Sequence, residues 1–137
     1  MSLILTLNNA NVHITDEEAE AAIKKLLDAL RWKAKKEKWS YYIFIGFSRS
    51  NQKIKAERPH FHIFLFANPC CTVVHWINDY WNPPKKSRRK SRGIVKRKGI
   101  DEQKAGYFLN GYIRGQSVFT REQKIGDLSE FCNSLKA

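Results

Sequence analysis

The alternation of hydrophobic and polar positions predicts that the chain begins with a strand followed by a long helix. Leucines alternate with other residues over 3–7, which is typical of a short strand. Thr15 with Glu18 three residues later forms the pattern of a capping box, which predicts a helix start. The helix is expected to end near Glu37–Lys38. Its buried stripe is expected to consist of Ala19, Ala22, Ile23, Leu26, Leu27 and Leu30.

Two aromatic and β-branched segments follow and predict two strands, over 40–47 (SYYIFIGF) and 59–66 (PHFHIFLF). The polar stretch 48–58 joins them. An amphipathic pattern then predicts a helix over 72–81. The residues expected to face inward from that helix are Val73, Trp76, Ile77 and Tyr80.

The rest of the chain carries weaker signals. Asp101 is expected to cap a helix that runs to about Gly115, 117–120 is expected to form a short strand, and 128–135 a final helical turn. The order β-α-β-β-α predicts an α+β fold: a ferredoxin-like sandwich with a central antiparallel sheet and helices packed mainly on one face. One or two further edge strands are expected in the basic stretch and in the tail.

Composition limits the class of protein. At 137 residues with 42% hydrophobic residues, the chain is expected to form one domain over 1–137 rather than an intrinsically disordered chain. Three cysteines, two of them adjacent, indicate neither a disulfide framework nor a zinc knuckle. No segment has the pattern of a membrane span or signal peptide. We therefore expect a location in the cytoplasm, that of a host cell if the source is viral, and no membrane partner.

The charge of the chain is concentrated in one segment. The formal net charge is +12, from 25 basic and 13 acidic residues, which indicates a polyanionic partner. Nine of the basic residues lie in 85–98 (KKSRRKSRGIVKRK), and the remaining 16 against 13 acidic residues leave only +3 elsewhere. We interpret 82–99 as a flexible basic loop that follows a phosphate backbone; a solvated loop or a localisation tract is the alternative.

A histidine pair lies within the second predicted strand. Because the side chains of a strand alternate between its faces, His60 and His62 are expected to project from the same face. The alternate residues Phe61, Ile63 and Leu65 are expected in the core. Two adjacent imidazoles on one face can share a divalent cation; a hydrogen-bonded surface pair is the alternative.

The helix predicted after the basic segment carries three aromatic residues. Phe108, Tyr112 and Gln116 follow one another at i+4 spacing along one helix face. Tyr107 lies about 140° around the helix from Tyr112, so the two tyrosines do not readily serve one site. The spacing fits an aromatic core stripe as well as a functional tyrosine.

Taken together, these features resemble the HUH endonuclease superfamily, and especially the small rolling-circle-type replication initiators (Rep proteins) of plasmids, single-stranded DNA viruses and archaeal viruses. The segment 58–66 (RPHFHIFLF) is similar to the histidine strand of that family, and 107–117 (YFLNGYIRGQS) is similar to its tyrosine helix. The segment 3–7 (LILTL) is similar to the first strand of the family, and Trp76 to a residue of the helix after the histidines.

The resemblance implies a metal-dependent DNA nicking-joining endonuclease for rolling-circle replication. A tyrosine would attack single-stranded DNA at a replication origin or genome terminus, leave a 5′-phosphotyrosine adduct and a free 3′-OH, and later rejoin strands. Mn²⁺ or Mg²⁺ held by His60 and His62 is the implied cofactor, and a homodimer is implied as well.

Contacts to DNA are expected from basic residues and from aromatic residues near the basic segment. Trp81 or Tyr80 is expected to stack on unpaired bases. The basic residues expected to bind DNA are Lys85, Lys86, Arg88, Arg89, Lys90, Arg92, Lys96, Arg97, Lys98 and Arg114.

The chain departs from the family pattern at two places. Many members carry a glutamate as third metal ligand near the end of the strand before the histidines, where this chain has 45–48 (IGFS). Glu57 and Gln116 are the alternatives for that ligand. The family helix often carries a second tyrosine or a lysine, whereas position 108 is phenylalanine.

Phe108 marks the nucleophile position if it replaces a natural tyrosine. If Phe108 is native, Tyr112 is the preferred nucleophile and Tyr107 the second. Two other classes stay open: a non-catalytic basic nucleic-acid-binding module, and a single-strand transposase of the HUH type. The chain has no P-loop, so no helicase activity is expected.

Overall fold

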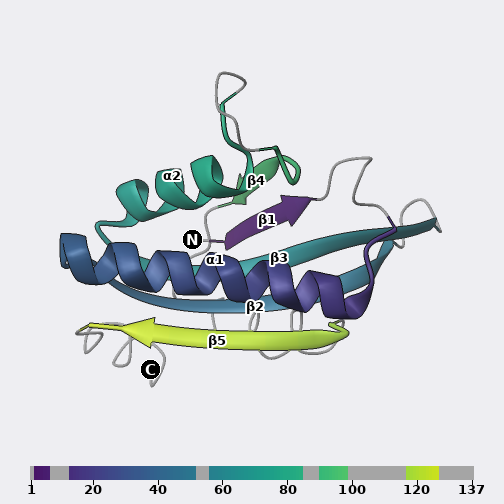
Figure 1. The fold of residues 1–137 in the computed structure, drawn as a ribbon, viewed down its shortest axis with the longest axis horizontal. Coiled ribbons are helices and arrows are strands. Elements are labelled where there is room, and N and C mark those ends of the chain that lie inside the picture. The colour runs from purple at the N-terminus through teal and green to yellow at the C-terminus, as the bar shows by residue number, and fades with distance from the viewer. Residues whose placement is uncertain (1, 7–12, 52–55, 85–89, 99–116, 127–137) are drawn as a thin grey trace.

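The structure, a computed structural model, describes residues 2–6, 13–51, 56–84, 90–98 and 117–126. These residues form an α+β fold in which two helices accompany an antiparallel sheet (Figure 1). The elements in chain order are β1 (Ser2–Thr6), α1 (Asp16–Glu37), β2 (Ser40–Asn51), β3 (Ala56–Asn68), α2 (Cys70–Trp81), β4 (Val95–Lys98) and β5 (Phe119–Ile125).

The sheet places β3 at its centre. Among the described residues the strand order is β4-β1-β3-β2-β5, and every neighbouring pair is antiparallel. Each of the two helices therefore follows one strand and leads to another that lies two positions away, which is the split β-α-β arrangement. As a result, β3 has both of its edges paired, and its side chains lie near the middle of the sheet.

The pairing of β2 with β3 contains one irregularity. Ser48 lies opposite His60, but Ser50 lies opposite Glu57, so β3 has one residue more than β2 between these pairs. Such a bulge changes which face of the sheet the following residues occupy, because the side-chain period of a strand is two.

Local interactions explain where α1 begins and ends. The Thr15 hydroxyl accepts a hydrogen bond from the Glu18 backbone N–H, and the Glu18 carboxylate accepts one from the Thr15 N–H, which completes the capping box. At the other end Lys38 adopts a left-handed conformation with φ of 60°. The expected start and end of this helix are thus confirmed.

Both helices pack on the same face of the sheet. The core consists of the apolar stripes of α1 and α2 together with the odd-numbered residues over 41–47 in β2 and 61–67 in β3, all of them buried. Figure 1 shows α1 across the front of β2 and β3, with α2 beside it. The fully buried strand residues of this face are Tyr41, Ile43, Ile45, Phe47, Phe61, Ile63 and Leu65. Burial of Phe61, Ile63 and Leu65 confirms the expected alternation along β3.

Several element boundaries differ from the sequence-based expectations. Strands β2 and β3 each extend into the polar stretch 48–58, because they continue to pair with one another beyond their apolar segments. The last four residues of the basic segment form β4, which pairs with β1 at the edge of the sheet, so the expected edge strand in the basic stretch is confirmed and this part of 82–99 is a strand rather than a loop. The tail strand is β5, longer and later than the expected 117–120.

The expected helix over 101–115 and the final turn over 128–135 lie outside the described residues. Within the described part of the chain, neither helix combines the length and the apolar character needed to cross a membrane.

Candidate metal and nucleic-acid site

The histidine pair lies on the central strand, on the face opposite the helices. His60 and His62 alternate with Phe61 and Ile63, whose side chains are buried in the core between sheet and helices. The sheet thus separates the imidazoles from α1 and α2. Because β3 is paired along both edges, its backbone is held rigidly at these positions.

The two imidazoles converge on one point. The Nε2 atoms of His60 and His62 are 2.9 Å apart, and the rings are nearly perpendicular at 81° with centroids 4.6 Å apart. Two nitrogen ligands about 2.1 Å from one cation and at right angles to each other lie about 3.0 Å apart. The separation of the Nε2 atoms therefore fits a shared divalent cation, and it equally fits a hydrogen bond between two neutral rings.

The two histidines differ in exposure. His62 is buried and its Nδ1 atom is shielded from solvent, while His60 is half-buried. Burial lowers the pKa of His62 to about 4, and the neighbouring His60 lowers it as well. A neutral imidazole is the form that binds a metal, so His62 is in its ligating form at neutral pH.

The neighbouring strand β2 places small or polar residues beside the pair, while β1 places Ile4 opposite His62 and Thr6 opposite His60. Ser48 lies opposite His60 and is buried, and Gly46 lies opposite His62, so β2 puts no side chain directly beside the His62 ring. Thr120 of β5 lies opposite Gly46 on the far side. These cross-strand neighbours were missed by sequence analysis, because they depend on the register between strands rather than on local spacing.

The same face becomes apolar toward the other end of the strands. Phe44 and Phe64 lie opposite one another and are buried, and Tyr42 meets Phe64 edge-on with ring centroids 6.4 Å apart. The face therefore changes from polar around the histidines to aromatic about two residues further along β3.

The third ligand expected for a metal site is not fixed by the described residues. Within them, no group of three histidine, cysteine, aspartate or glutamate residues is arranged to hold a metal ion. Gln116 lies outside the described residues. Glu57 is described only in its backbone, which pairs with Ser50 on the far side of the bulge from His60.

The expected nucleophile positions lie outside the described residues as well. These are Tyr107, Phe108 and Tyr112, and the expected DNA-binding residue Arg114 belongs to the same segment.

The basic segment is described over its second half. Lys85, Lys86, Arg88 and Arg89 lie outside the described residues, whereas Lys90 is exposed. The backbone N–H of Arg92 donates to the Trp81 carbonyl, and its guanidinium lies 5.8 Å from the centre of the Trp81 ring. The residues Lys96, Arg97 and Lys98 belong to β4, which pairs with β1. The described part of the segment is thus attached to α2 through Arg92 and to the sheet through β4.

One expected contact to DNA is wrong. Trp81 is completely buried, packed edge-on against Phe61 with ring centroids 5.4 Å apart, so it cannot stack on a base. Tyr80 is half-buried and stacks on Trp76, with ring centroids 5.3 Å apart. Trp81 continues the i+4 series of Val73 and Ile77, both buried, and this spacing was the signal that Trp81 faces the core.

Comparisons of this chain with protein-family models, with curated proteins and with solved structures find no match.

Proposed function

We propose that the chain is a metal-dependent endonuclease of the HUH type that nicks and rejoins single-stranded DNA, as a replication initiator does. The observation that carries this proposal is the convergence of the His60 and His62 Nε2 atoms to 2.9 Å on the central strand. A chance pair of surface histidines would not be expected on a doubly paired strand with one ring buried.

The fold supports the proposal. The first six described elements follow the order β-α-β-β-α-β, with β3 between β1 and β2, which is the order of a ferredoxin-like sandwich, and β5 adds a further strand beside β2. The sequence resemblance implies an HUH sandwich with a central antiparallel sheet, and His60 and His62 of this chain lie on the central strand β3. Both helices lie on the other face, so the histidine face is the one on which a DNA strand would be bound.

The donor set suits a small divalent cation. Imidazole nitrogens bind Mn²⁺ more readily than Mg²⁺, which prefers oxygen ligands, so a site that contains two histidines favours Mn²⁺. When bound by His60 and His62, the cation would supply electrostatic stabilisation of the charge that develops on the scissile phosphate.

The residues of the chain would then supply the nucleophile and hold the strand. A tyrosine hydroxyl from 107–112 attacks the phosphorus, the phenolic proton passes to solvent water, which can return a proton to the leaving oxygen, and a new bond forms between the tyrosine oxygen and phosphorus. The bond from phosphorus to the 3′ oxygen breaks, and that oxygen takes up a proton to give a free 3′-OH. The phosphoester is retained in the tyrosine adduct, so the reverse reaction rejoins the strands.

The basic segment supports binding of the strand beside the histidines. Its last residues lie in β4, two strands away from β3 in the same sheet. Lysine and arginine side chains bind phosphates without regard to sequence, and release of counterions makes such binding weaker at high salt. The segment would hold a DNA strand at the β4 edge of the sheet, two strands away from the histidines.

A covalent-capture experiment tests this proposal. A randomised single-stranded DNA pool labelled at the 3′ end is incubated with the full chain and Mn²⁺, then separated on a denaturing gel. Because the adduct forms on the 5′ phosphate of the downstream fragment, the label is expected to migrate with the protein. The adduct is expected with Mn²⁺ and not with EDTA. It is expected to be reduced in His60→Ala and His62→Ala. The matched control is His75→Ala, which removes an exposed histidine on α2 and should leave the adduct unchanged.

Position 108 is part of the same experiment. The native chain and a Phe108→Tyr variant are tested together, and Tyr112→Phe and Tyr107→Phe then identify the nucleophile. If neither the native chain nor Phe108→Tyr forms an adduct, the enzymatic proposal is wrong. Binding of the pool that is indifferent to EDTA and to His60→Ala would favour a non-catalytic nucleic-acid-binding module instead.

A further inference from the structure

A second basic cluster lies outside the segment 85–98, on the C-terminal half of α1. Residues 31–38 (RWKAKKEK) contain five basic residues and one acidic residue. The net charge of +3 outside 85–98 does not reveal this cluster, because acidic residues elsewhere in the chain offset its positive charge. Its exposed members other than Glu37, here called the α1 basic face, are Arg31, Trp32, Lys35, Lys36 and Lys38.

We propose that the α1 basic face binds a single-stranded nucleic acid, with a base stacked on Trp32 and the backbone phosphates along the surrounding lysines and Arg31. This inference goes beyond the nicking activity and does not depend on it, because the α1 basic face lies on the other side of the sheet from His60 and His62.

Trp32 is the first observation that carries the inference. With 67% of its surface exposed, it is the most exposed large hydrophobic side chain in the described part of the chain. The other described tryptophans are buried or half-buried. An indole ring is a flat surface on which any base can stack, and such stacking does not depend on sequence.

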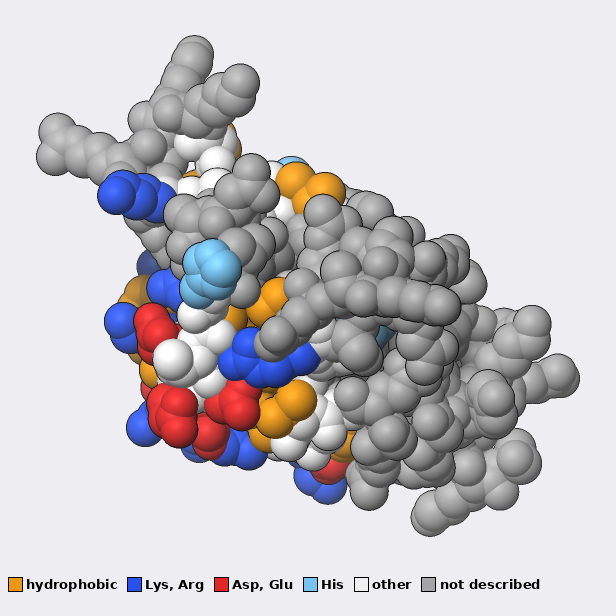
Figure 2. Space-filling model, turned by 90° about the vertical axis from the view of Figure 1, so that its right-hand side faces the viewer, with side chains coloured by type: hydrophobic (Ala, Val, Ile, Leu, Met, Phe, Trp, Pro, Cys, Tyr) orange, Lys and Arg blue, Asp and Glu red, His pale blue; other side chains and the backbone are white. Residues whose placement is uncertain are grey.

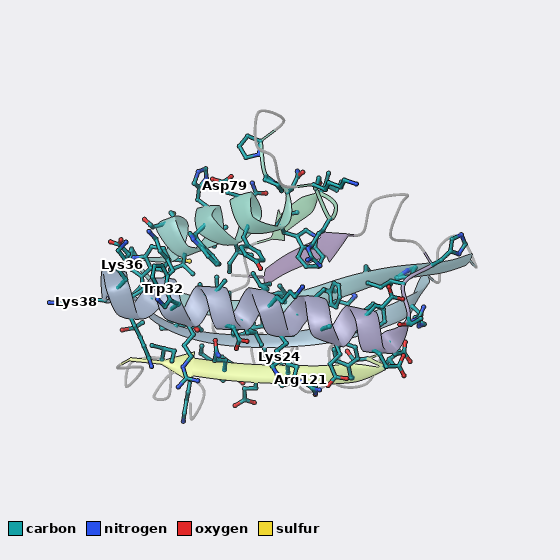
Figure 3. The ribbon with its side chains drawn as sticks, in the orientation of Figure 1. Lys24, Trp32, Lys36, Lys38, Asp79 and Arg121 are labelled. Atoms are coloured by element: carbon teal, nitrogen blue, oxygen red, sulfur yellow. The ribbon has the colours of Figure 1, made fainter. Side chains whose placement is uncertain are left out.

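The arrangement of charge around Trp32 is the second observation. The Lys36 ammonium lies 5.3 Å from the centre of the Trp32 ring. Figure 3 shows Trp32, Lys36 and Lys38 together at the C-terminal end of α1. Since residues four apart are neighbours on a helix, Arg31 and Lys35 form an adjacent row. A base on the ring would therefore have cationic groups on both sides of it for its phosphates.

The acidic residue of the cluster does not neutralise this surface. Glu37 pairs with Lys33, with Nζ and Oε1 3.2 Å apart, at the flank of the helix. Among the described residues, no ion pair joins a carboxylate to any of the four cationic side chains of the α1 basic face. Their positive charge therefore remains available to a polyanion.

A membrane surface is a less suitable partner. A helix that lies in a membrane interface inserts a broad apolar face. In α1 that face is already occupied, because Ile23, Leu26 and Leu30 are completely buried against the sheet and α2. Trp32 is the single large apolar side chain that the helix exposes, which suits stacking on one base better than insertion into lipid.

Fluorescence anisotropy with a labelled oligothymidylate, in EDTA so that no nicking occurs, tests the inference on the full chain. Trp32→Ala is expected to weaken binding about tenfold, and Trp32→Phe to retain most of the affinity, since one base–aromatic stack contributes this much. Lys36→Glu is expected to weaken binding and to reduce the slope of log affinity against log salt by about 0.7, the value for one phosphate of a single strand.

Lys24→Glu is the matched control, because it makes the same charge change on an exposed position of the same helix about three turns away. It is expected to have a smaller effect than Lys36→Glu. Acrylamide quenching gives a second measurement: the oligonucleotide should protect tryptophan fluorescence in the native chain and not in Trp32→Phe. Unchanged thermal unfolding shows that each variant is folded.

Equal affinity of Trp32→Ala and the native chain would overturn the inference, as would equal losses for Lys24→Glu and Lys36→Glu without any effect of Trp32. Binding to anionic lipid vesicles that depends on Trp32, without such dependence for the oligonucleotide, would also overturn it. Failure to form a tyrosine adduct would contradict the nicking proposal alone and leave this inference standing.

Discussion

The two faces of the sheet carry different kinds of side chain on the same strands. On the helix side, β2 and β3 present Ile43, Phe47, Phe61 and their neighbours, which are buried against α1 and α2. On the other side, the same strands present Ser48, His60 and His62. At this end of the strands, alternate residues thus contribute to the core on one face, while the residues between them form the polar histidine site on the other.

The core on the helix side and the histidine site on the other side depend on one another, because the same strands carry both. Phe61 stands between the two histidines in sequence, and its ring packs against Phe47 and Trp81. The core on the helix side therefore fixes the backbone that holds the imidazoles, so the geometry at the histidines depends on packing across the sheet.

Figure 2, which shows another side of the molecule, has acidic and basic side chains interspersed over its described surface.

The largest expected effect is on the rate of adduct formation, which substitutions on the histidine face should reduce. If the proposed nicking function holds, His60→Ala and His62→Ala are each expected to reduce the rate of adduct formation about a thousandfold or more, because loss of a proposed metal ligand would remove several kcal/mol of transition-state stabilisation. The rate is measured with Mn²⁺ in the covalent-capture experiment. His75→Ala should leave the rate unchanged, and a similar loss for that variant would contradict a specific role of the pair.

The next largest effect is on the free energy of unfolding, which truncation on the helix face should reduce more than truncation on the histidine face. Phe61→Ala is expected to reduce the free energy of unfolding by about 3–5 kcal/mol, because it leaves a cavity beside Phe47 and Trp81. Phe66→Ala, the same truncation on the other face of β3 at a half-buried position, is expected to cost less than half as much. Denaturant unfolding measures both, and equal losses would contradict the assignment of the core to the helix side.

A pH effect tests the burial of His62. The folded chain keeps this imidazole neutral down to about pH 4, whereas the unfolded chain protonates it near pH 6.5. Its contribution to stability is therefore full above pH 6.5 and is lost as the pH falls toward 4, where the loss reaches about 3 kcal/mol. Unfolding in EDTA is compared between the native chain and His62→Gln, and parallel pH profiles for the two would contradict the prediction.

The smallest effect concerns the start of α1 on the helix side. Thr15→Ala removes one half of the capping box and is expected to cost about 1 kcal/mol of unfolding free energy. Thr72→Ala in the first turn of α2 is the control, because the N-cap residue of α2 is Pro69, which makes no side-chain cap hydrogen bond, and the variant is expected to change stability by less than about 0.5 kcal/mol. Equal effects of the two variants would show that the cap is not a local stabilising contact.

Local patterns predicted the elements that form through local interactions. The Thr15–Glu18 capping box and the apolar stripe of α1 lie where periodicity placed them. Strand β5 was displaced from its expected position because its sequence, FTREQKI, has no strong alternation. Its strand conformation comes from pairing with β2, more than seventy residues earlier in the chain. A local sequence pattern cannot predict a pairing with such a distant strand.

The sequence by itself determined that His60 and His62 share a face with period two, because successive side chains of a strand point to opposite sides by covalent geometry. Only the tertiary structure decided that their Nε2 atoms converge, that Gly46 and Ser48 lie beside them, and that His62 is buried with a lowered pKa. These properties arise from strand register and from packing between residues far apart in the chain, which no local spacing specifies.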